Sequence, residues 1–284
     1  MDITILGSGG GSGIPNAFCR CASCEAARLA GGKSLRNGPA VLVNDDLLID
    51  CGPDVRPGVR RLGLRLAELR TLVITHRHAD HLDPWFFWER RGVDDTELPP
   101  LTVYAPPDAL VAVFDFYQRR VGLDRAALEA RTRTVWQPVQ AGTMTLAGRY
   151  RLSFFPAAHG AGEAEPMEAV LVGVSDSQAS YLHGYDTGPF PAGTWAMLAG
   201  HRFDAVALDS CLGLQQDFDT PEHMSGRQVI EHAARLRQEG ILKPGGLVLA
   251  THFVHHSPGT HDDLVAYYGP HGITVAYDGL RLTL

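Results

Sequence analysis

The feature that most constrains this chain is a dense group of metal-binding side chains directly after a short apolar run. Residues 72–74 predict a buried strand, and residues 75–81 follow it with the pattern Thr-His-x-His-x-Asp-His. The two histidines of the His-x-His pair can chelate one ion at the strand end, while the Asp and His past the bend can face a second. Imidazole and carboxylate together suit zinc, manganese or iron, and two such ions close together form a hydrolytic centre. The pattern therefore predicts a metal site, because a solvated histidine-rich turn rarely reaches this density.

The His-x-His-x-Asp-His motif after an apolar strand resembles the signature of the metallo-β-lactamase superfamily of binuclear hydrolases. The resemblance implies an α/β fold, the αββα sandwich, in which two mixed sheets are flanked by helices. It implies one such domain over residues 1–284. It also implies a further histidine, a bridging aspartate and a final histidine later in the chain.

Three later residues match those expected positions. His159 follows a predicted strand at 152–156, and His252 ends a predicted strand at 246–251. Asp186 lies in Tyr-x-x-Gly-x-Asp-Thr-Gly, which resembles the family's bridging-aspartate motif. A carboxylate at this point can span two ions about 3.5–4 Å apart. The expected ligands of two divalent ions, Zn²⁺ or Mn²⁺, are His76, His78, Asp80, His81, His159, Asp186 and His252.

Two further roles are expected within this centre. Asp80 is counted as a catalytic residue as well as a ligand. By the same resemblance, Asp50 and the two residues after it are expected to support the metal-binding loop from behind.

Three of the five cysteines crowd into six residues, as Cys19, Cys21 and Cys24. The odd count and this crowding favour a metal site in a reducing compartment over a disulfide framework. Three thiolates can take three corners of a tetrahedral zinc ion, which leaves the fourth for a distant residue. His255 is the expected fourth ligand and the adjacent His256 is the alternative. A structural zinc would then join residues 19–24 to the segment 252–256.

His223 is a candidate proton donor. Thr220 and Pro221 are good residues for the start of a helix, which is predicted to run to about Gln238. The positive end of this helix would lower the pKa of His223, and a histidine opposite a metal pair can protonate a leaving group. A core or surface role is an equally good interpretation of this histidine.

Two segments near the predicted site leave alternatives open. The glycine-rich residues 7–13 lack the Lys-Ser/Thr of a P-loop, so they favour a tight turn beside the active site over a nucleotide cradle. The aromatic run at 85–88 fits the core as well as it fits a wall of the substrate pocket. In the second case, Arg90 or Arg91 could steer an anion.

Two predictions concern elements away from the motifs. Residues 107–130, rich in Ala, Leu and Phe, predict a helix. Residues 273–276 and 280–284 predict a C-terminal hairpin that turns at Asp278 and Gly279.

The net charge of the chain and the hydropathy along it limit which partners and which location are expected. The net charge of −7 argues against broad capture of nucleic acid, which needs a basic face. No apolar run approaches the ~20 residues of a membrane span, and the first residues do not have the pattern of a secretory signal. A cytoplasmic protein with a small-molecule substrate is therefore expected, and a homodimer is one option for its assembly.

Within the superfamily, three motifs together resemble the PhnP-type phosphoribosyl cyclic phosphodiesterases. These are Cys-x-Cys-x-x-Cys near the N-terminus, Thr-His-x-x-His near the C-terminus, and the intact His-x-His-x-Asp-His. The resemblance implies a phosphodiesterase for small or cyclic phosphodiesters, and it places His223 where that family has a histidine thought to assist catalysis. The PqqB type shares the cysteine triplet but tends to lack the full histidine cluster, so a working hydrolase is favoured. Alternatives are a nuclease of the tRNA-maturation type, a lactone, β-lactam or thioester hydrolase, and a PqqB-like binding or redox-carrier protein that does not hydrolyse.

Overall fold

The computed structural model describes residues 1–91, 98–162, 164–215, 220–257 and 259–284, and its strands form two seven-stranded sheets. The first sheet contains, in spatial order, β14 (Arg281–Thr283), β1 (Asp2–Gly7), β2 (Ala40–Val43), β3 (Leu47–Ile49), β4 (Thr71–Val73), β5 (Leu101–Ala105) and β6 (Thr134–Pro138). The second contains β13 (Ile273–Val275), β12 (Leu242–Thr251), β11 (Phe203–Asp209), β10 (Ser180–Gly184), β9 (Val170–Ser175), β8 (Tyr150–Pro156) and β7 (Met144–Ala147). Both sheets are mixed, because β3 to β6 and β10 to β13 run parallel while the other neighbours are antiparallel.

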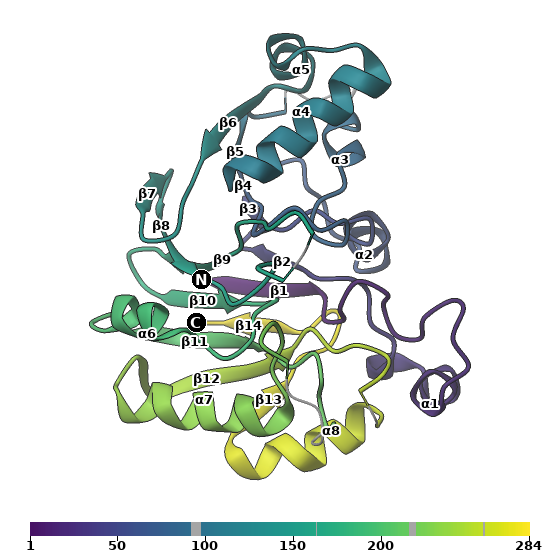
Figure 1. Cartoon of the computed structure of the whole chain (residues 1–284), viewed down its shortest axis with the longest axis vertical. Coiled ribbons are helices and arrows are strands. Elements are labelled where there is room, and N and C mark those ends of the chain that lie inside the picture. Colours follow the sequence, from purple (N-terminus) through teal and green to yellow (C-terminus); the bar gives the residue numbers. More distant parts are fainter. Residues whose placement is uncertain (92–97, 163, 216–219, 258) are drawn as a thin grey trace.

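Helices cover the outer face of each sheet (Figure 1). The first sheet packs against α2 (Val55–Arg61), α3 (Trp85–Trp88), α4 (Pro107–Val121) and α5 (Arg125–Thr132). The second packs against α6 (Ala192–Leu198), α7 (Gly226–Gln238) and α8 (His261–Tyr268). A third apolar cluster fills the space between the sheets. These layers confirm the predicted αββα sandwich.

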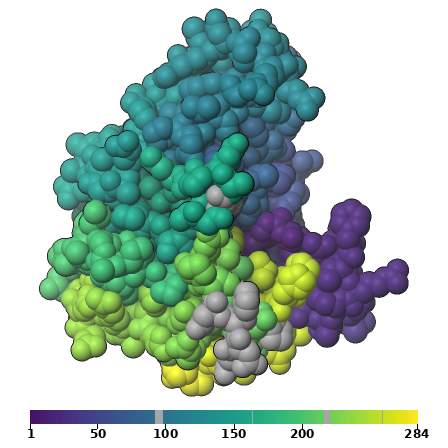
Figure 2. Space-filling view, viewed as in Figure 1, coloured from purple at the N-terminus to yellow at the C-terminus, as the bar shows by residue number. Residues whose placement is uncertain are grey.

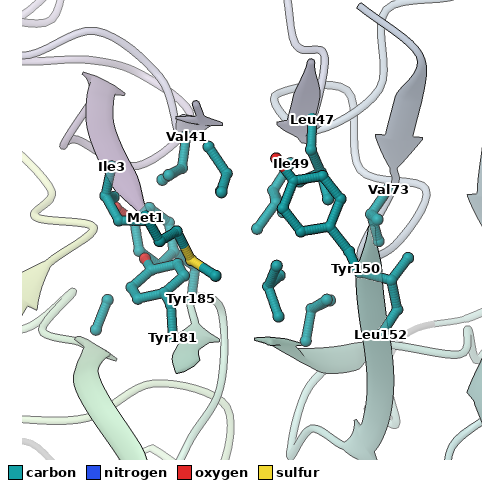
Figure 3. Close-up of a cluster of buried hydrophobic side chains, with 14 of the residues drawn as sticks. Met1, Ile3, Val41, Leu47, Ile49, Val73, Tyr150, Leu152, Tyr181 and Tyr185 are labelled. Atoms are coloured by element: carbon teal, nitrogen blue, oxygen red, sulfur yellow. The ribbon is translucent and has the colours of Figure 1, made fainter. Parts of the chain in front are cut away.

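The cluster between the sheets follows from strand periodicity, since alternate side chains of a strand share a face. Ile3, Val41 and Ile49 face inward from the first sheet, and Leu152 and Tyr181 meet them from the second (Figure 3). Burying apolar side chains at this interface is the main stabilising term for the sandwich.

One segment extends from the side of the sandwich. The residues before α1 (Ala22–Ala30), α1 itself and the short 3₁₀ helix Gly32–Ser34 form this arm, which is purple in Figures 1 and 2. The arm carries the cysteine triplet.

Two predicted elements differ from the observed ones. The helix predicted within 107–130 is two helices, because Gly122 takes a left-handed conformation with φ 70° and Asp124 caps the second helix by accepting from the Ala127 amide. The predicted C-terminal hairpin is wrong, since β13 pairs with β12 and β14 pairs with β1 in the other sheet. Buried Asp278 fixes the crossing between the sheets by accepting hydrogen bonds from Ser8.

The aromatic run forms α3 and serves mainly as core. Phe86 and Phe87 are buried beneath the first sheet's helices, whereas Trp85 is half-exposed. Arg90 donates hydrogen bonds to the carbonyls of Thr132 and Pro99. Its guanidinium therefore binds neighbouring backbone and is not free to contact an anion. In the part of the chain that the structure describes, no helix is long and apolar enough to cross a membrane.

Candidate metal centre

The predicted ligands lie in loops that follow four strands. His76, His78, Asp80 and His81 follow β4, while His159, Asp186 and His252 follow β8, β10 and β12. Strand ends of a sandwich meet along one edge, so residues far apart in the sequence converge there. The structure brings all seven predicted ligands together.

The ligands form two clusters that share one carboxylate. Ligand atoms of His76, His78, His159 and Asp186 lie within 4.8 Å of one another, and the same holds for Asp80, His81, Asp186 and His252. Asp186 Oδ2 lies 2.7 Å from His81 Nε2 and 3.3 Å from His76 Nε2. Its other oxygen, Oδ1, lies 3.2 Å from His252 Nδ1. Asp186 is therefore the carboxylate that the two clusters share, and it would be a common ligand if each cluster held an ion.

Asp50 supports the loop from behind, as the sequence predicts. The fully buried carboxylate accepts hydrogen bonds from the Thr75 amide at 2.8 Å and from His81 Nδ1 at 2.7 Å. Because Nδ1 is engaged there, the opposite nitrogen of His81 faces Asp186. A carboxylate that orients a ligating imidazole in this way is typical of metal sites.

The glycine-rich loop lies directly against the ligands. A Cβ on Gly11 would lie 3.0 Å from Asp80 Oδ2, and one on Gly10 would lie 3.3 Å from His252 Cε1. A side chain at either position would crowd a predicted ligand, so glycine suits the close approach of this loop to the site, in agreement with the predicted turn beside it.

The centre is buried and its charges are strongly coupled. Burial alone would raise the pKa of Asp186, but the imidazoles of His252 and His81 hold it well below its usual value. Burial alone would lower the pKa of His252, but Asp186 and Asp209 raise it to about 10. The pKa of His76 shifts in the opposite direction, because burial and the neighbouring His81 lower it to about 4.

The donor set fits divalent cations. Several atoms in it are buried and have no hydrogen-bond partner within the described residues, namely Asp186 Oδ1, His81 Nε2 and both ring nitrogens of His252. Such atoms cost free energy unless something satisfies them. Imidazole nitrogen with carboxylate oxygen is a set that binds first-row dications well.

His223 faces this centre, although its predicted setting is wrong. Helix α7 begins at Gly226, because Ser225 and Gln228 form a capping box, so His223 lies before the helix and not in its first turn. Its Nδ1 lies 3.1 Å from Asp209 Oδ2 and 3.5 Å from Asp186 Oδ1. Burial lowers the pKa of His223, but the Asp209 carboxylate outweighs burial and raises it to about 12. The predicted lowering by a helix end is therefore wrong.

Asp209 is a buried carboxylate beside this centre to which the sequence reasoning gave no role. Fully buried at the end of β11, it accepts from the amides of Cys211 at 2.9 Å and Met224 at 3.2 Å, and it faces both His223 and His252. The available signal was an acidic residue directly after an apolar strand, which is also the setting of Asp50.

The cysteine triplet forms a separate cluster with His255. The Sγ atoms of Cys19, Cys21 and Cys24 and a ring nitrogen of His255 lie within 4.8 Å of one another. Cys21 Sγ is 3.9 Å from His255 Nδ1. His255 is buried, while the ring of His256 lies beside it, tilted by 42° with ring centroids 3.8 Å apart, and is exposed. The geometry places His255, and not His256, in this cluster.

Comparisons with known proteins agree with this arrangement. A model described as the beta-lactamase superfamily domain matches residues 46–253. The coenzyme PQQ synthesis protein B of Methylorubrum populi is 26% identical over 314 aligned positions that cover all of both chains. The protein of the same name from Methylorubrum extorquens PA1 is 31% identical over 128 positions, which are 40% of each chain.

Three solved structures share the fold. A diphosphatase from the PhnP family has a TM-score of 0.73 at 23% identity, covering 100% of this chain and 97% of its own. Zinc-bound PqqB from Methylobacterium extorquens has a TM-score of 0.73 at 21% identity, with both chains fully covered. The short form of human tRNase Z has a TM-score of 0.66 at 15% identity, covering 100% of this chain and 99% of its own. With a matched domain across most of its length and the two-sheet sandwich described above, the chain belongs to the metallo-β-lactamase superfamily.

Proposed function

We propose that the chain is a binuclear metal-dependent phosphodiesterase that acts on small or cyclic phosphodiesters. The observation that carries the proposal is the position of Asp186 in both ligand clusters, with His223 beside it. His76, His78, His159 and Asp186 would hold one ion, and Asp80, His81, Asp186 and His252 the other. Two bound dications supply hydroxide at neutral pH and neutralise the charge of a phosphoryl group.

The other roles in the proposed reaction belong to side chains of the protein. Asp186 and the imidazoles fix the two ion positions, and Asp50 keeps His81 turned toward Asp186. His223 is the proton donor for the leaving alkoxide, since the Asp209 carboxylate 3.1 Å from its Nδ1 favours the protonated imidazole. Asp209 accepts from Nδ1 of His223, so the opposite ring nitrogen is the one that can face a leaving group.

The substrate class rests on likeness and charge. The cysteine triplet, the His cluster and the Thr-His-x-x-His motif together resemble the PhnP type, and a PhnP-family diphosphatase shares the fold. The net charge of −7 favours a small diester over a long polyanion. The cysteine cluster would hold a third, structural zinc, and its thiolates suit a reducing cytoplasm.

A screen of the metal-loaded protein tests this function. The substrates are bis-p-nitrophenyl phosphate, p-nitrophenyl phosphate, a lactone, a β-lactam and an acyl thioester. We expect the phosphodiester to be preferred and Asp186→Ala to be inactive on it. Preference for the lactone, β-lactam or thioester would establish another hydrolase, and cleavage of a precursor tRNA in preference to small diesters would establish a nuclease.

A second candidate is a PqqB-like protein that does not hydrolyse. Identity of 26% to a coenzyme PQQ synthesis protein B over the full length favours it. It predicts two bound ions with no turnover of any ester in the screen, whereas the phosphodiesterase proposal predicts turnover that depends on those ions.

A further inference from the structure

Arg77 lies between the two histidines of the His-x-His pair, and its side chain contacts two other parts of the chain. Its Nε lies 3.2 Å from Oδ2 of Asp108, which is in the first turn of α4. Its Nη2 donates to the carbonyl of Glu165, which lies in the loop between β8 and β9. Arg77 therefore joins the loop of the metal motif to α4 and to a second loop, and the proposed reaction gives it no role.

Asp108 holds the same second loop at another point. Its Oδ2, the oxygen that faces Arg77, also accepts from the amide of Glu168 at 3.3 Å. Its Oδ1 accepts from the amide of Ala109 at 2.9 Å, which orients the carboxylate at the start of α4. We name the Arg77–Asp108 ion pair, with its contacts to Glu165 and Glu168, the loop clamp.

The loop clamp joins the two loops that carry the histidines of one ligand cluster. His76 and His78 flank Arg77, and His159 lies in the second loop. His78 Nδ1 lies 3.0 Å from His76 Nε2 and 3.1 Å from His159 Nε2, so the three rings converge on one place. A shift of either loop changes the spacing of nitrogens that would all bind one ion. The other cluster takes no ligand from the second loop, since it consists of Asp80, His81, Asp186 and His252.

Other anchors of the second loop limit how far it can move without the loop clamp. The amide of Ala158 donates to Thr187 Oγ1 at 2.9 Å, and the amide of Gly162 donates to Glu222 Oε1 at 3.2 Å. These contacts hold the end of the loop near His159, whereas the loop clamp holds its other end. Loss of the loop clamp should therefore displace His159 slightly and leave the fold intact.

We propose that the loop clamp sets the affinity of the ion whose ligands include His159 and leaves the affinity of the other ion nearly unchanged. Arg77 and Asp108 are positioning residues, because they act on the ion only through the backbone of the two loops. Their side chains are 25% and 29% exposed, so water screens the ion pair only in part. Residues that support metal ligands typically change metal affinity by about 10–100-fold, and the remaining anchors place the expected change near the lower limit. The inference rests on the two ion positions of the proposed function and not on its substrate.

Retention of manganese tests the proposal without any substrate. The protein is loaded with Mn²⁺, dialysed against increasing concentrations of EDTA, and analysed for manganese per chain. Thiolates favour zinc over manganese, so the count reports the carboxylate and imidazole positions. We expect Arg77→Met and Asp108→Asn each to lose one of two ions at an EDTA concentration about tenfold lower than the wild-type chain. Asp115→Asn is the matched control, since Asp115 forms an exposed ion pair with Arg119 on the same helix, and it should behave as wild type.

Combined variants show which ion is affected and whether the two residues act as a pair. His252→Ala weakens the other ion, so adding Asp108→Asn should lower the manganese that this variant still holds. In His159→Ala, where the affected ion is already weakened, Asp108→Asn should change nothing further. Arg77→Met combined with Asp108→Asn should lose no more than either single variant, because both remove the same ion pair.

Hydrogen exchange gives a readout on the second loop itself. Backbone amides of residues 164–169 should exchange faster in Arg77→Met and Asp108→Asn than in the wild-type chain or in Asp115→Asn. Manganese retention like wild type in both single variants, equal weakening of both ions, or additive losses in the double variant would overturn the proposal. Failure of the proposed function alone would appear as two retained ions with no ester turnover, which leaves these outcomes unaffected.

Discussion

The buried His/Asp centre and the cysteine cluster both gather metal-binding side chains from distant parts of the chain, but their settings differ. The centre contains carboxylates, has buried ring nitrogens and a carboxylate oxygen that make no hydrogen bond within the described residues, and includes one residue shared by two clusters. The cysteine cluster has three thiols and one imidazole, and Cys19 and Cys21 are partly exposed. A closed thiolate set leaves no position for water, whereas carboxylate and imidazole sites can keep one open. Under the proposed function, ligand type and burial distinguish the reactive centre from the structural one, even though only two residues separate His252 from His255.

The largest effect should follow loss of the shared carboxylate. Asp186→Ala should remove detectable phosphodiesterase activity and weaken both active-site ions, because Asp186 belongs to both clusters. Elemental analysis and turnover of bis-p-nitrophenyl phosphate measure the two results. Asp262→Ala, on the exposed side of α8, is the control and should change neither. Full metal content with persisting activity would mean that the bridge is misassigned.

Loss of His223, the proposed proton donor, should have a smaller effect that depends on the substrate. His223→Ala should lower turnover by roughly 10²–10⁴-fold on a diester with a poor leaving group. The loss should be much smaller on p-nitrophenyl esters, whose leaving group needs no proton. An equal loss on both substrates would show that His223 positions or packs and does not donate.

The pH dependence of activity in Asp209→Asn is a further test of His223 as the proton donor. Removing the carboxylate that raises the pKa of His223 should let that pKa fall. A general acid is active only while protonated, so the decline of activity at high pH should begin at a lower pH than in the wild-type chain. If the decline of activity at high pH were the same in both proteins, His223 would not be the group whose deprotonation causes it.

Damage to the cysteine cluster should affect stability before chemistry. Cys21→Ser should remove one equivalent of zinc and lower Tm, because structural zinc contributes to folding free energy. For a domain of about this size, each kcal/mol lost lowers Tm by roughly 2–4 °C. Activity should fall only indirectly, through movement of the segment that carries His252. Complete loss of turnover with an unchanged Tm would place this cluster in the reaction and undo the distinction between the two sites.

The smallest expected effect is a difference in zinc content between substitutions at two adjacent histidines. His255→Ala should lose the zinc of the cysteine cluster, since His255 Nδ1 lies 3.9 Å from Cys21 Sγ. His256→Ala should keep it, because His256 is exposed outside the cluster. Zinc content per chain measures both, and the reverse pattern would show that the fourth ligand is wrong by one residue.

Residues whose roles follow from local pattern were predictable from the sequence. The strand before His76 and the spacing of the motif predicted the first ligands, and resemblance to the superfamily predicted His159, Asp186 and His252, which the structure brings to one place. The partner of His223 was not predictable in this way. Asp209 acts through tertiary proximity, and nothing in its local sequence sets it apart from other acidic residues at strand ends.

The errors in secondary structure have local physical causes. Thr220 and Pro221 are as suitable for a helix start as the observed cap, but only Ser225 has a Gln three residues later that completes a capping box. The sequence pattern of the C-terminal residues is that of a hairpin. However, Asp278 accepts a hydrogen bond from the Ser8 amide after β1, and β14 pairs with β1 in the other sheet. Long-range contacts of this kind leave no periodic signal in the sequence.

The central claim is that two ions in the buried centre perform the chemistry and the third does not. Phosphodiesterase activity of the metal-free Cys21→Ser variant, titrated with Zn²⁺ or Mn²⁺, tests it most directly because this variant removes the third site. We predict that activity increases until two equivalents per chain are bound and then stays constant. Full activity at one equivalent, or activity that does not depend on added metal, would contradict the account.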